Sequence, residues 1–435
     1  MAKRPLGLGK KQAQKKKQKF LKENTPEVKS TSESPTPTSE TKTPSNQIQI
    51  ELQDSEDADN EIVQLNGLWK TYFESDKDDE MLLNGIIHEC DRILRLINNN
   101  NNNDKSEEAT KLKALVNKDD RYYAIFALAL SELTIFKKGS DDDDEMDNEV
   151  KQFFDLALQR CQDGLDCIPN SQLLKLVMSK ILLQRLPLEY ISKLNVKSKE
   201  SKGKYLKLYE QFGKAKENFS IYKNDLPLTL EVLNSTDDLL DIIENFGHED
   251  DIEEGLDSDD DEELEPITLA KDHPLYKFQK NHESDLSWLK EQLIALFDIM
   301  HGSDKLIHPV ARKIGELYMK FADSPRSQYL KLQYGDDEDE QNSIAAKDKG
   351  GLVYAAQREA IELVDNSLKY LRKAQVKDDP ETWVQLAEAC IEFGNLCDNE
   401  SIEQKKAYQE AEEILKKANR ATNGKYQDIL DNLLD

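Results

Sequence analysis

Beyond residue 60, the apolar residues of this chain recur at steps of three and four almost throughout. A first such run is made of Leu65, Leu68, Trp69, Tyr72 and Phe73. A second is made of Leu82, Ile86, Ile87, Cys90, Ile93, Leu94 and Ile97. This spacing places each run on one face of a helix. Alternating stretches bounded by hairpin turns, which would indicate strands, are missing from the sequence. The sequence therefore predicts an all-α fold.

Small and aromatic residues within these regions recur at spacings typical of the tetratricopeptide repeat, a pair of antiparallel helices. One predicted pair joins Tyr123, Phe126, Ala127 and Leu130 to Ala157, Cys161, Gly164 and Pro169. A second joins Ala311, Ile314, Gly315 and Tyr318 to Ser367, Leu371 and Ala374. A third joins Trp383, Leu386, Ala387 and Cys390 to Ala411, Leu415 and Ala418. Because the spacing between the two helices exceeds that of the regular repeat, we expect a divergent tetratricopeptide-like array with enlarged loops. The alternative is a generic helical bundle.

Composition divides the chain further. Residues 1–58 combine a basic head with a Ser/Thr/Pro-rich linker that carries too few apolar residues to form a core, so we expect disorder there. Acidic blocks begin at Ser140, His248 and Gly335. Runs of like charge are usually loops, and the longest, over 248–266, is the predicted linker between two lobes. We therefore expect an N-terminal helical lobe over 59–247 and a C-terminal tetratricopeptide-like lobe over 267–435.

Charge is distributed unevenly along the chain. The formal net charge is −27, yet the first 22 residues hold nine Lys/Arg and no acid. The rest has 50 Lys/Arg against 86 Asp/Glu, a net charge of −36. A body this acidic is repelled by phosphate backbones, so nucleic acid is a poor partner for it, and basic proteins suit it better. The acidity could equally serve solubility alone.

No chemistry-bearing motif stands out. Phosphate-loop, GxSxG and HExxH patterns are absent from the sequence, as are zinc-spaced Cys/His sets. The five cysteines lack CxxC spacing and lie among apolar residues of helical pattern, which indicates reduced core thiols. No run of apolar residues is long enough for a membrane span. We therefore expect a protein of the cytosol or nucleus, not an enzyme, with no catalytic residue, cofactor or metal.

The basic head is predicted to be a nuclear import signal read by an import receptor. Its cations are Lys3, Arg4, Lys10, Lys11, Lys15, Lys16, Lys17 and Lys19. Only one aromatic residue, Phe20, lies among them, whereas single-strand binders stack bases on several rings. Contact of the head with RNA or the ribosome, and a merely solvated tail, are the alternatives. Candidate phosphorylation sites, each followed by acids, are Ser55, Ser140 and Ser258.

The opening "MAKRPLGLGK", followed by its Lys-rich run, resembles the start of the fungal enhancer-of-translation-termination family. This family is also known as the negative regulator of a prolyl-hydroxylase-like oxygenase. The resemblance implies a nuclear, non-catalytic adaptor, shuttling with the cytoplasm or resident, that binds a 2-oxoglutarate-dependent prolyl hydroxylase acting on a small-subunit ribosomal protein. It also implies a role in translation termination. The alternative function is a ribosome- or RNA-associated factor that contacts rRNA through the head.

Aromatic residues of the C-terminal pairs are the candidates for a partner groove. They are Tyr318, Tyr354, Trp383 and Tyr408. Packing in the core is the competing role for Trp383, because it follows the apolar spacing of the first helix in its predicted pair.

Overall fold

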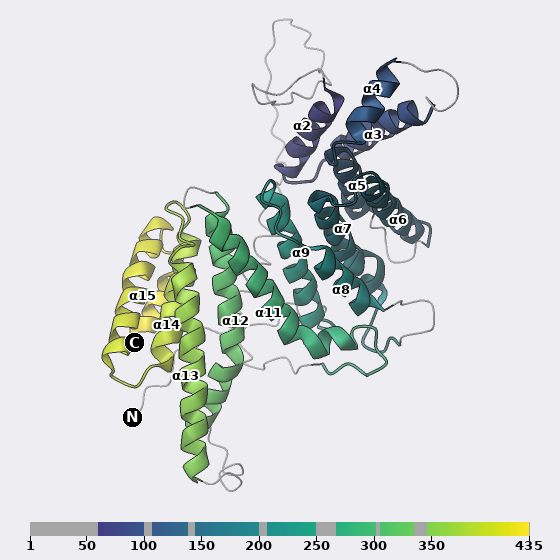
Figure 1. Ribbon diagram of the computed structural model, residues 1–435. Helices are drawn as coiled ribbons and strands as arrows, with labels where there is room; N and C mark the ends of the chain where they lie inside the picture. Colours follow the sequence, from purple (N-terminus) through teal and green to yellow (C-terminus); the bar gives the residue numbers. More distant parts are fainter. Residues whose placement is uncertain are drawn as a thin grey trace, which may run out of the picture. The chain divides into compact units, whose positions relative to one another are not determined.

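The computed structural model describes residues 60–99, 107–137, 144–199, 207–248, 267–301, 305–334 and 346–434. Regular structure within these ranges is entirely helical, which confirms the predicted all-α class (Figure 1). The first helices are α2 (Glu61–Phe73), α3 (Glu80–Asn99), α4 (Glu107–Val116), α5 (Arg121–Leu133), α6 (Asp144–Cys167), α7 (Gln172–Arg185), α8 (Leu208–Asn218) and α9 (Leu226–Glu244). They are followed by α11 (Tyr276–Ile299), α12 (Ile307–Tyr334), α13 (Ala346–Leu371), α14 (Pro380–Leu396), α15 (Ile402–Ala421) and α16 (Gln427–Leu434).

The described residues divide into two compact units, and the division along the chain falls within α11, between His282 and Glu283. Residues 267–282 pack with the N-terminal unit: the Phe278 ring lies 5.4 Å from that of Phe212, centroid to centroid. The acidic segment 248–266 lies outside the described residues except for His248. Its role as a linker, and the predicted bounds of the two lobes, stay predictions.

Helix α5 is the centre of the N-terminal unit. Every residue from Tyr122 to Leu133 is buried, and α2, α3, α6 and α7 all pack against it. A helix that is apolar on all sides must be covered on all sides, and Glu132 is the single charged residue in this buried stretch. The predicted pairing of this helix with α6 is confirmed. A Cβ added at Gly164 of α6 would lie only 2.7 Å from the Cβ of Tyr123, so the lack of a side chain there lets the two helices pack closely.

A network of buried charges joins three helices of the N-terminal unit. Lys180 of α7 is 1% exposed and forms ion pairs with Glu132 of α5 and with Glu231 of α9, the latter at 3.1 Å. Lys77 reaches the other carboxylate oxygen of Glu231 at 2.7 Å. Burial works against the charge of Lys180, but the two glutamates outweigh it and raise its pKa. Burial likewise opposes the charge of Glu231, but the two lysines outweigh it and lower its pKa.

The C-terminal unit is built from two antiparallel pairs, α12 with α13 and α14 with α15 (Figure 1). The Ser367 hydroxyl donates to the Gly315 carbonyl at 2.8 Å, which joins the first pair where its helices are closest. In the second pair, a Cβ added at Gly394 would meet the Tyr408 ring at 2.5 Å. The second and third predicted pairs are therefore confirmed as packed helices, and small residues allow both approaches.

The first of these pairs has long helices, and the second has a short connection. Helix α12 has 28 residues and α13 has 26. Helix α14 ends at Leu396 and α15 begins at Ile402, so the expectation of an enlarged loop in the last pair is wrong. The extra residues between Cys390 and Ala411 continue the two helices instead. Ser401 then starts α15 directly, because its hydroxyl accepts a hydrogen bond from the Gln404 amide at 3.1 Å.

Candidate protein-interaction surfaces

Several of the predicted functional residues lie outside the described residues. They are the import-signal cations Lys3, Arg4, Lys10, Lys11, Lys15, Lys16, Lys17 and Lys19, and the candidate phosphorylation sites Ser55, Ser140 and Ser258. Both groups stay predictions.

The four aromatic residues of the predicted groove have different surroundings. Tyr318 of α12 is half-buried, and its ring stacks on that of Tyr370 with 5.9 Å between centroids. Tyr354 of α13 is 65% exposed. Trp383 is 7% exposed, and its indole nitrogen donates to the Val376 carbonyl at 2.8 Å. The Tyr408 hydroxyl donates to the side-chain oxygen of Asn395, on the other helix of its pair, at 2.8 Å. Of the four, Tyr354 alone offers most of its ring to solvent.

These four residues also lie at different levels along the helices. Tyr408 packs on Gly394 of α14, whereas Trp383 lies eleven residues earlier on that helix, about 16 Å away at 1.5 Å per residue. Gln357 donates to the Leu396 carbonyl, which places the Tyr354 region of α13 at the Tyr408 level. A groove that includes all four residues would therefore run along the length of the α13–α14 contact.

A cluster of aromatic rings and lysines joins α11, α12 and α13 within the C-terminal unit. The Phe297 ring packs edge-on against Tyr370, at 5.5 Å between centroids. The Lys373 ammonium lies 4.9 Å from the Phe297 centroid, and the Lys290 ammonium lies 5.0 Å from that of Tyr318. Burial lowers the pKa of Lys290. The sequence analysis missed this cluster because its members come from three helices and share no local spacing.

Carboxylates line the neighbouring surface of α14. Helices α12 and α14 lie side by side, since Gln385 donates to Glu316 at 3.2 Å and Arg326 pairs with Glu392 at 2.7 Å. Glu392 is largely buried, and this burial outweighs the pairing with Arg326 and raises its pKa. Burial is also the main cause of the raised pKa of Tyr426, to which the charges of nearby Glu381 and Glu388 add. This face of the unit can attract cations.

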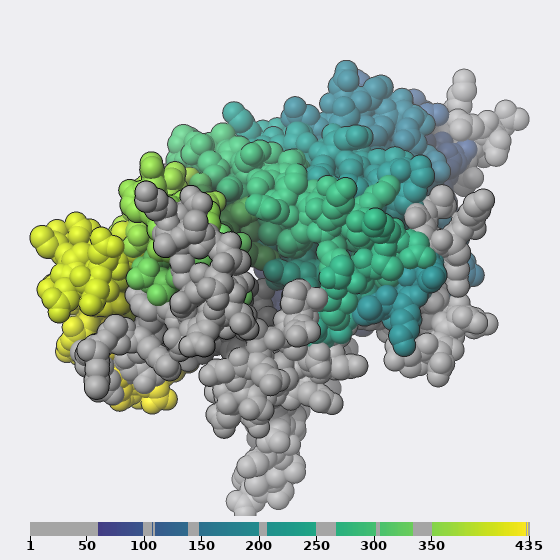
Figure 2. Space-filling model, turned by 90° about the horizontal axis from the view of Figure 1, so that it is seen from below, coloured from purple at the N-terminus to yellow at the C-terminus, as the bar shows by residue number. Residues whose placement is uncertain are grey.

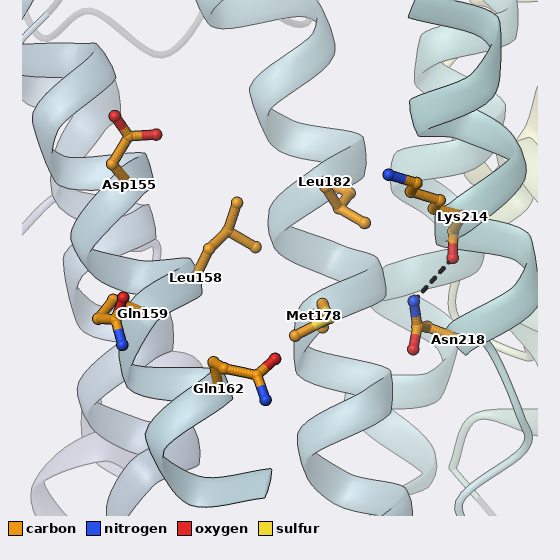
Figure 3. Close-up of a pocket in the computed structure, with 8 residues that line it drawn as sticks. All are labelled: Asp155, Leu158, Gln159, Gln162, Met178, Leu182, Lys214 and Asn218. Atoms are coloured by element: carbon orange, nitrogen blue, oxygen red, sulfur yellow. Dashed lines mark hydrogen bonds between the residues drawn. The ribbon is translucent and has the colours of Figure 1, made fainter. Parts of the chain in front are cut away.

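The N-terminal unit has a hollow between α6, α7 and α8, shown in Figure 3. Its volume is about 350 Å³. Leu158, Met178 and Leu182 form its apolar part. Its polar lining residues are Asp155, Gln159, Gln162, Lys214 and Asn218. Asp155 is already paired with Arg185 at 2.8 Å, and Asn218 donates to the Lys214 carbonyl at 2.9 Å. The hollow could take an apolar side chain, but it brings together no set of reactive groups.

The thiols are arranged for packing and not for chemistry. Cys90, Cys161 and Cys390 are buried, as expected, and burial raises the pKa of each, that of Cys390 to about 12. Cys167 is exposed, so the expectation of a core thiol is wrong there: it is the last residue of α6, where the helix leaves the core. Cys397 is half-buried.

The described part of the chain holds no group of three or more His, Cys, Asp or Glu suited to a metal ion. Within the same ranges, no helix combines the length and the apolar character that a membrane crossing requires.

Solved structures with a related helical arrangement belong to proteins named Nro1. One is titled as the nuclear import adaptor Nro1 of S. pombe; it is 18% identical, with a TM-score of 0.45 over 85% of this chain and 98% of that one. Another, titled as the hypoxic regulator of sterol synthesis Nro1, a nuclear import adaptor, is 16% identical, with a TM-score of 0.46 over 85% of this chain and 92% of the other.

Curated relatives match from end to end. The protein named Enhancer of translation termination 1 is 46% identical to this chain in Saccharomyces cerevisiae S288c, over 438 residues. Its namesakes are 48% identical in Vanderwaltozyma polyspora and 44% identical in Kluyveromyces lactis, and in all three the alignment covers 100% of both chains. These matches confirm the resemblance carried by the opening decapeptide.

A family model described as nuclear pore complex subunit Nro1 matches residues 1–434. Its description agrees with the nuclear localisation predicted from the basic head, and the protein is nuclear. With a match over nearly the whole chain and relatives at this identity, the chain belongs to the Nro1 family, whose curated members are named Enhancer of translation termination 1.

Proposed function

We propose that this protein is a non-catalytic adaptor that acts in translation termination by binding a prolyl hydroxylase of the 2-oxoglutarate oxygenase class and its small-subunit ribosomal substrate. The family supports the general role, because its members are named for translation termination and proteins named Nro1 are titled nuclear import adaptors. The basic head would engage an import receptor, which gives an otherwise acidic protein a route into the nucleus.

The observation that carries the proposal is the stack of long helix pairs in the C-terminal unit. Consecutive pairs of this kind present extended surfaces, and repeat proteins use such surfaces to bind other proteins. Here α14 carries Glu381 and Glu388 near Tyr426, while Glu316 of α12 is paired with Arg312 at 3.1 Å. A basic ribosomal protein would be attracted to these carboxylates, and its association should weaken as salt screens the charges.

Exposed apolar residues on α13 offer the surface for the oxygenase. Leu352 is 43% exposed and Tyr354 is 65% exposed. They lie two positions apart on α13 and so point to different sides of the helix, and a partner that contacts both must reach around it. Large exposed aromatic residues often anchor interfaces, because they bury much area with few rotatable bonds. Within the predicted groove, Tyr318, Trp383 and Tyr408 would then support the surface, while Tyr354 makes the contact.

Affinity purification of the tagged full chain from yeast, followed by mass spectrometry, tests the proposal. We expect a prolyl hydroxylase-like dioxygenase and a small-subunit ribosomal protein to co-purify with the wild type. A Leu352→Ala, Tyr354→Ala variant should lose the dioxygenase, whereas Ile402→Ala, which removes a side chain 66% exposed elsewhere in the same unit, should keep it. Recovery of neither partner with the wild type would refute the proposal.

Removal of residues 1–22 distinguishes the roles of the head. If the head is an import signal, the shortened protein becomes cytoplasmic and still binds its partners in vitro. If the head instead holds rRNA, ribosome association falls while nuclear entry is unchanged.

A further inference from the structure

The surface of the C-terminal unit is hollowed beside Trp383, where α14 and α15 meet. The hollow has a volume of about 600 Å³. Its lining residues are Trp383 of α14 and Glu413, Lys416, Lys417, Arg420 and Ala421 of α15. Helices α15 and α16, drawn in yellow in Figure 2, form one compact exposed part of this unit. Its charged lining residues, Glu413, Lys416, Lys417 and Arg420, are all exposed, and three of the six lining residues are cations.

Two of these cations have no carboxylate partner among the described residues. The Lys417 ammonium lies 3.9 Å from the centroid of the Trp383 ring. Arg420, one turn further along the exposed side of α15, forms no ion pair within the described ranges. In a chain with 86 acids and 59 bases, two unpaired neighbouring cations need an explanation.

The nearby acids do not neutralise the hollow. Lys416 is paired with Glu412, so these two charges cancel. Glu413 is the remaining acid in the lining, and it accepts a hydrogen bond from Gln409 at 3.2 Å. Lys417 and Arg420 therefore leave the hollow with a net positive charge, on a chain whose net charge is −27.

Local helix energetics explain only part of this arrangement. A cation in the last turn is favoured by the helix dipole, which accounts for Arg420. Lys417 lies one turn earlier, and its stem covers the Trp383 ring, a contact that stabilises the fold without using up the ammonium donors. Neither effect accounts for an open hollow whose two free cations lie three residues apart on one face of the helix.

We infer that the hollow beside Trp383 binds an acidic segment of a partner protein in which an apolar residue lies next to carboxylates. The carboxylates would pair with Lys417 and Arg420. The apolar residue would rest against Ala421 and the stems of Lys416 and Lys417, beside the nearly buried Trp383. Charge complementarity selects this occupant over a basic segment, which would meet two unpaired cations. A nucleic acid is disfavoured because the Trp383 ring, 7% exposed and covered by Lys417, is closed to base stacking. This site is separate from the acidic α14 face and takes ligands of the opposite charge.

Fluorescence polarisation with the full chain tests the inference. The probe is a short fluorescein-labelled peptide of alternating Asp and Leu, and a peptide of alternating Lys and Leu is its control. We expect the acidic probe to bind the wild type. The affinity of a Lys417→Glu, Arg420→Glu variant for this probe should be lower by roughly tenfold or more. Both side chains are exposed, so the variant should fold as the wild type does.

A matched variant distinguishes binding at the hollow from a general effect of the changed net charge. Lys405→Glu with Lys406→Glu makes the same charge change on exposed positions of the same helix, about three to four turns away. It should keep the affinity for the acidic probe within about twofold. The inference is overturned if the wild type fails to bind the acidic probe or if the two variants weaken binding equally. Tighter binding of the basic peptide, or displacement of the probe by a single-stranded oligonucleotide at lower concentration than by unlabelled acidic peptide, would overturn it as well.

Discussion

The two units hold buried charge in contrasting ways. In the N-terminal unit, Lys180 is enclosed by Glu132 and Glu231, and the attraction between the charges exceeds the cost of burial, as the lowered pKa of Glu231 shows. In the C-terminal unit, Glu392 meets Arg326 at a helix contact, and burial exceeds the attraction, as its raised pKa shows. Ion pairing alone therefore does not predict whether a buried charge stabilises its unit.

The difference follows from the neighbouring charges: two lysines lie near Glu231, whereas Glu392 has one arginine and the like charge of Asp323 near it. The number of helices joined differs as well. Lys180, Glu132 and Glu231 come from α7, α5 and α9, so the network fixes three helices at once. Arg326 and Glu392 join only α12 and α14, while the close contact of α12 with α13 depends on Gly315. We infer that the N-terminal unit depends on its polar network for a unique arrangement, while the C-terminal unit depends on the fit of its helix surfaces.

The largest effect should come from Lys180→Ala. It leaves the buried Glu132 carboxylate without its lysine, a loss of about 3–5 kcal/mol in the free energy of unfolding. Amide hydrogen exchange, followed separately for α5–α9 and α12–α15, should show faster exchange in the first set alone. Lys175→Ala is the matched control, because Lys175 is an exposed residue on the same helix. Replacing Lys180 by Met together with Glu132→Gln and Glu231→Gln should recover much of the loss. Equal faster exchange in both units would contradict the contrast.

This network also marks a limit of sequence-based prediction. The helices and their pairing could be predicted because their signals are local: apolar periodicity gave α2 and α3, and Gly164 indicated a close approach. Lys180 carries no such signal, since a lysine within "QLLKLVMSKILLQR" has the pattern of a solvated helix face. Its partners lie 48 and 51 residues away. Only the packing of α5, α7 and α9 identifies it as a core residue.

The candidate surfaces show the same limit. Lys416, Lys417 and Arg420 have the spacing of an ordinary exposed helix face, and Trp383 has that of a core residue. The fold brings them together around one hollow. For Tyr354, the sequence indicated an aromatic residue in the right unit, but not that it would be the exposed member of the predicted groove.

A smaller effect is expected where glycines permit close helix contacts. In Gly164→Ala the new methyl group would lie 2.7 Å from the Tyr123 Cβ, which is fixed to the backbone of α5, so the helices must separate. We expect a loss of about 1–3 kcal/mol. In Gly315→Ala the methyl group meets the Leu371 side chain at 2.7 Å, which can change rotamer, so the loss should be smaller.

Urea denaturation of both glycine variants provides the measurement, with Gly213→Ala as the control. Gly213 lies within α8 and has nothing within 4 Å of an added Cβ, so this substitution should raise stability by up to about 1 kcal/mol. If Gly315→Ala were the more costly variant, the C-terminal pairs would be less adaptable than their side-chain contact indicates.

The smallest effect, and the most direct measure of the contrast, is the pH dependence of two glutamates. Glu231 has a lowered pKa in the folded state, so it contributes stability above its unfolded pKa and loses it as pH falls through the folded value. Glu392 has a raised pKa, so its contribution is present below the unfolded pKa and is lost as pH rises through the folded value.

Relative to the wild type, Glu231→Gln should therefore become less stable as pH rises from 4 to 7 (roughly the acid range over which glutamates titrate), and Glu392→Gln should become more stable. Hydrogen exchange of α9 and of α14 at several pH values would measure both trends in one experiment. Trends of the same sign would mean that the two buried glutamates are stabilised alike, because the sign records whether attraction or burial dominates at each site.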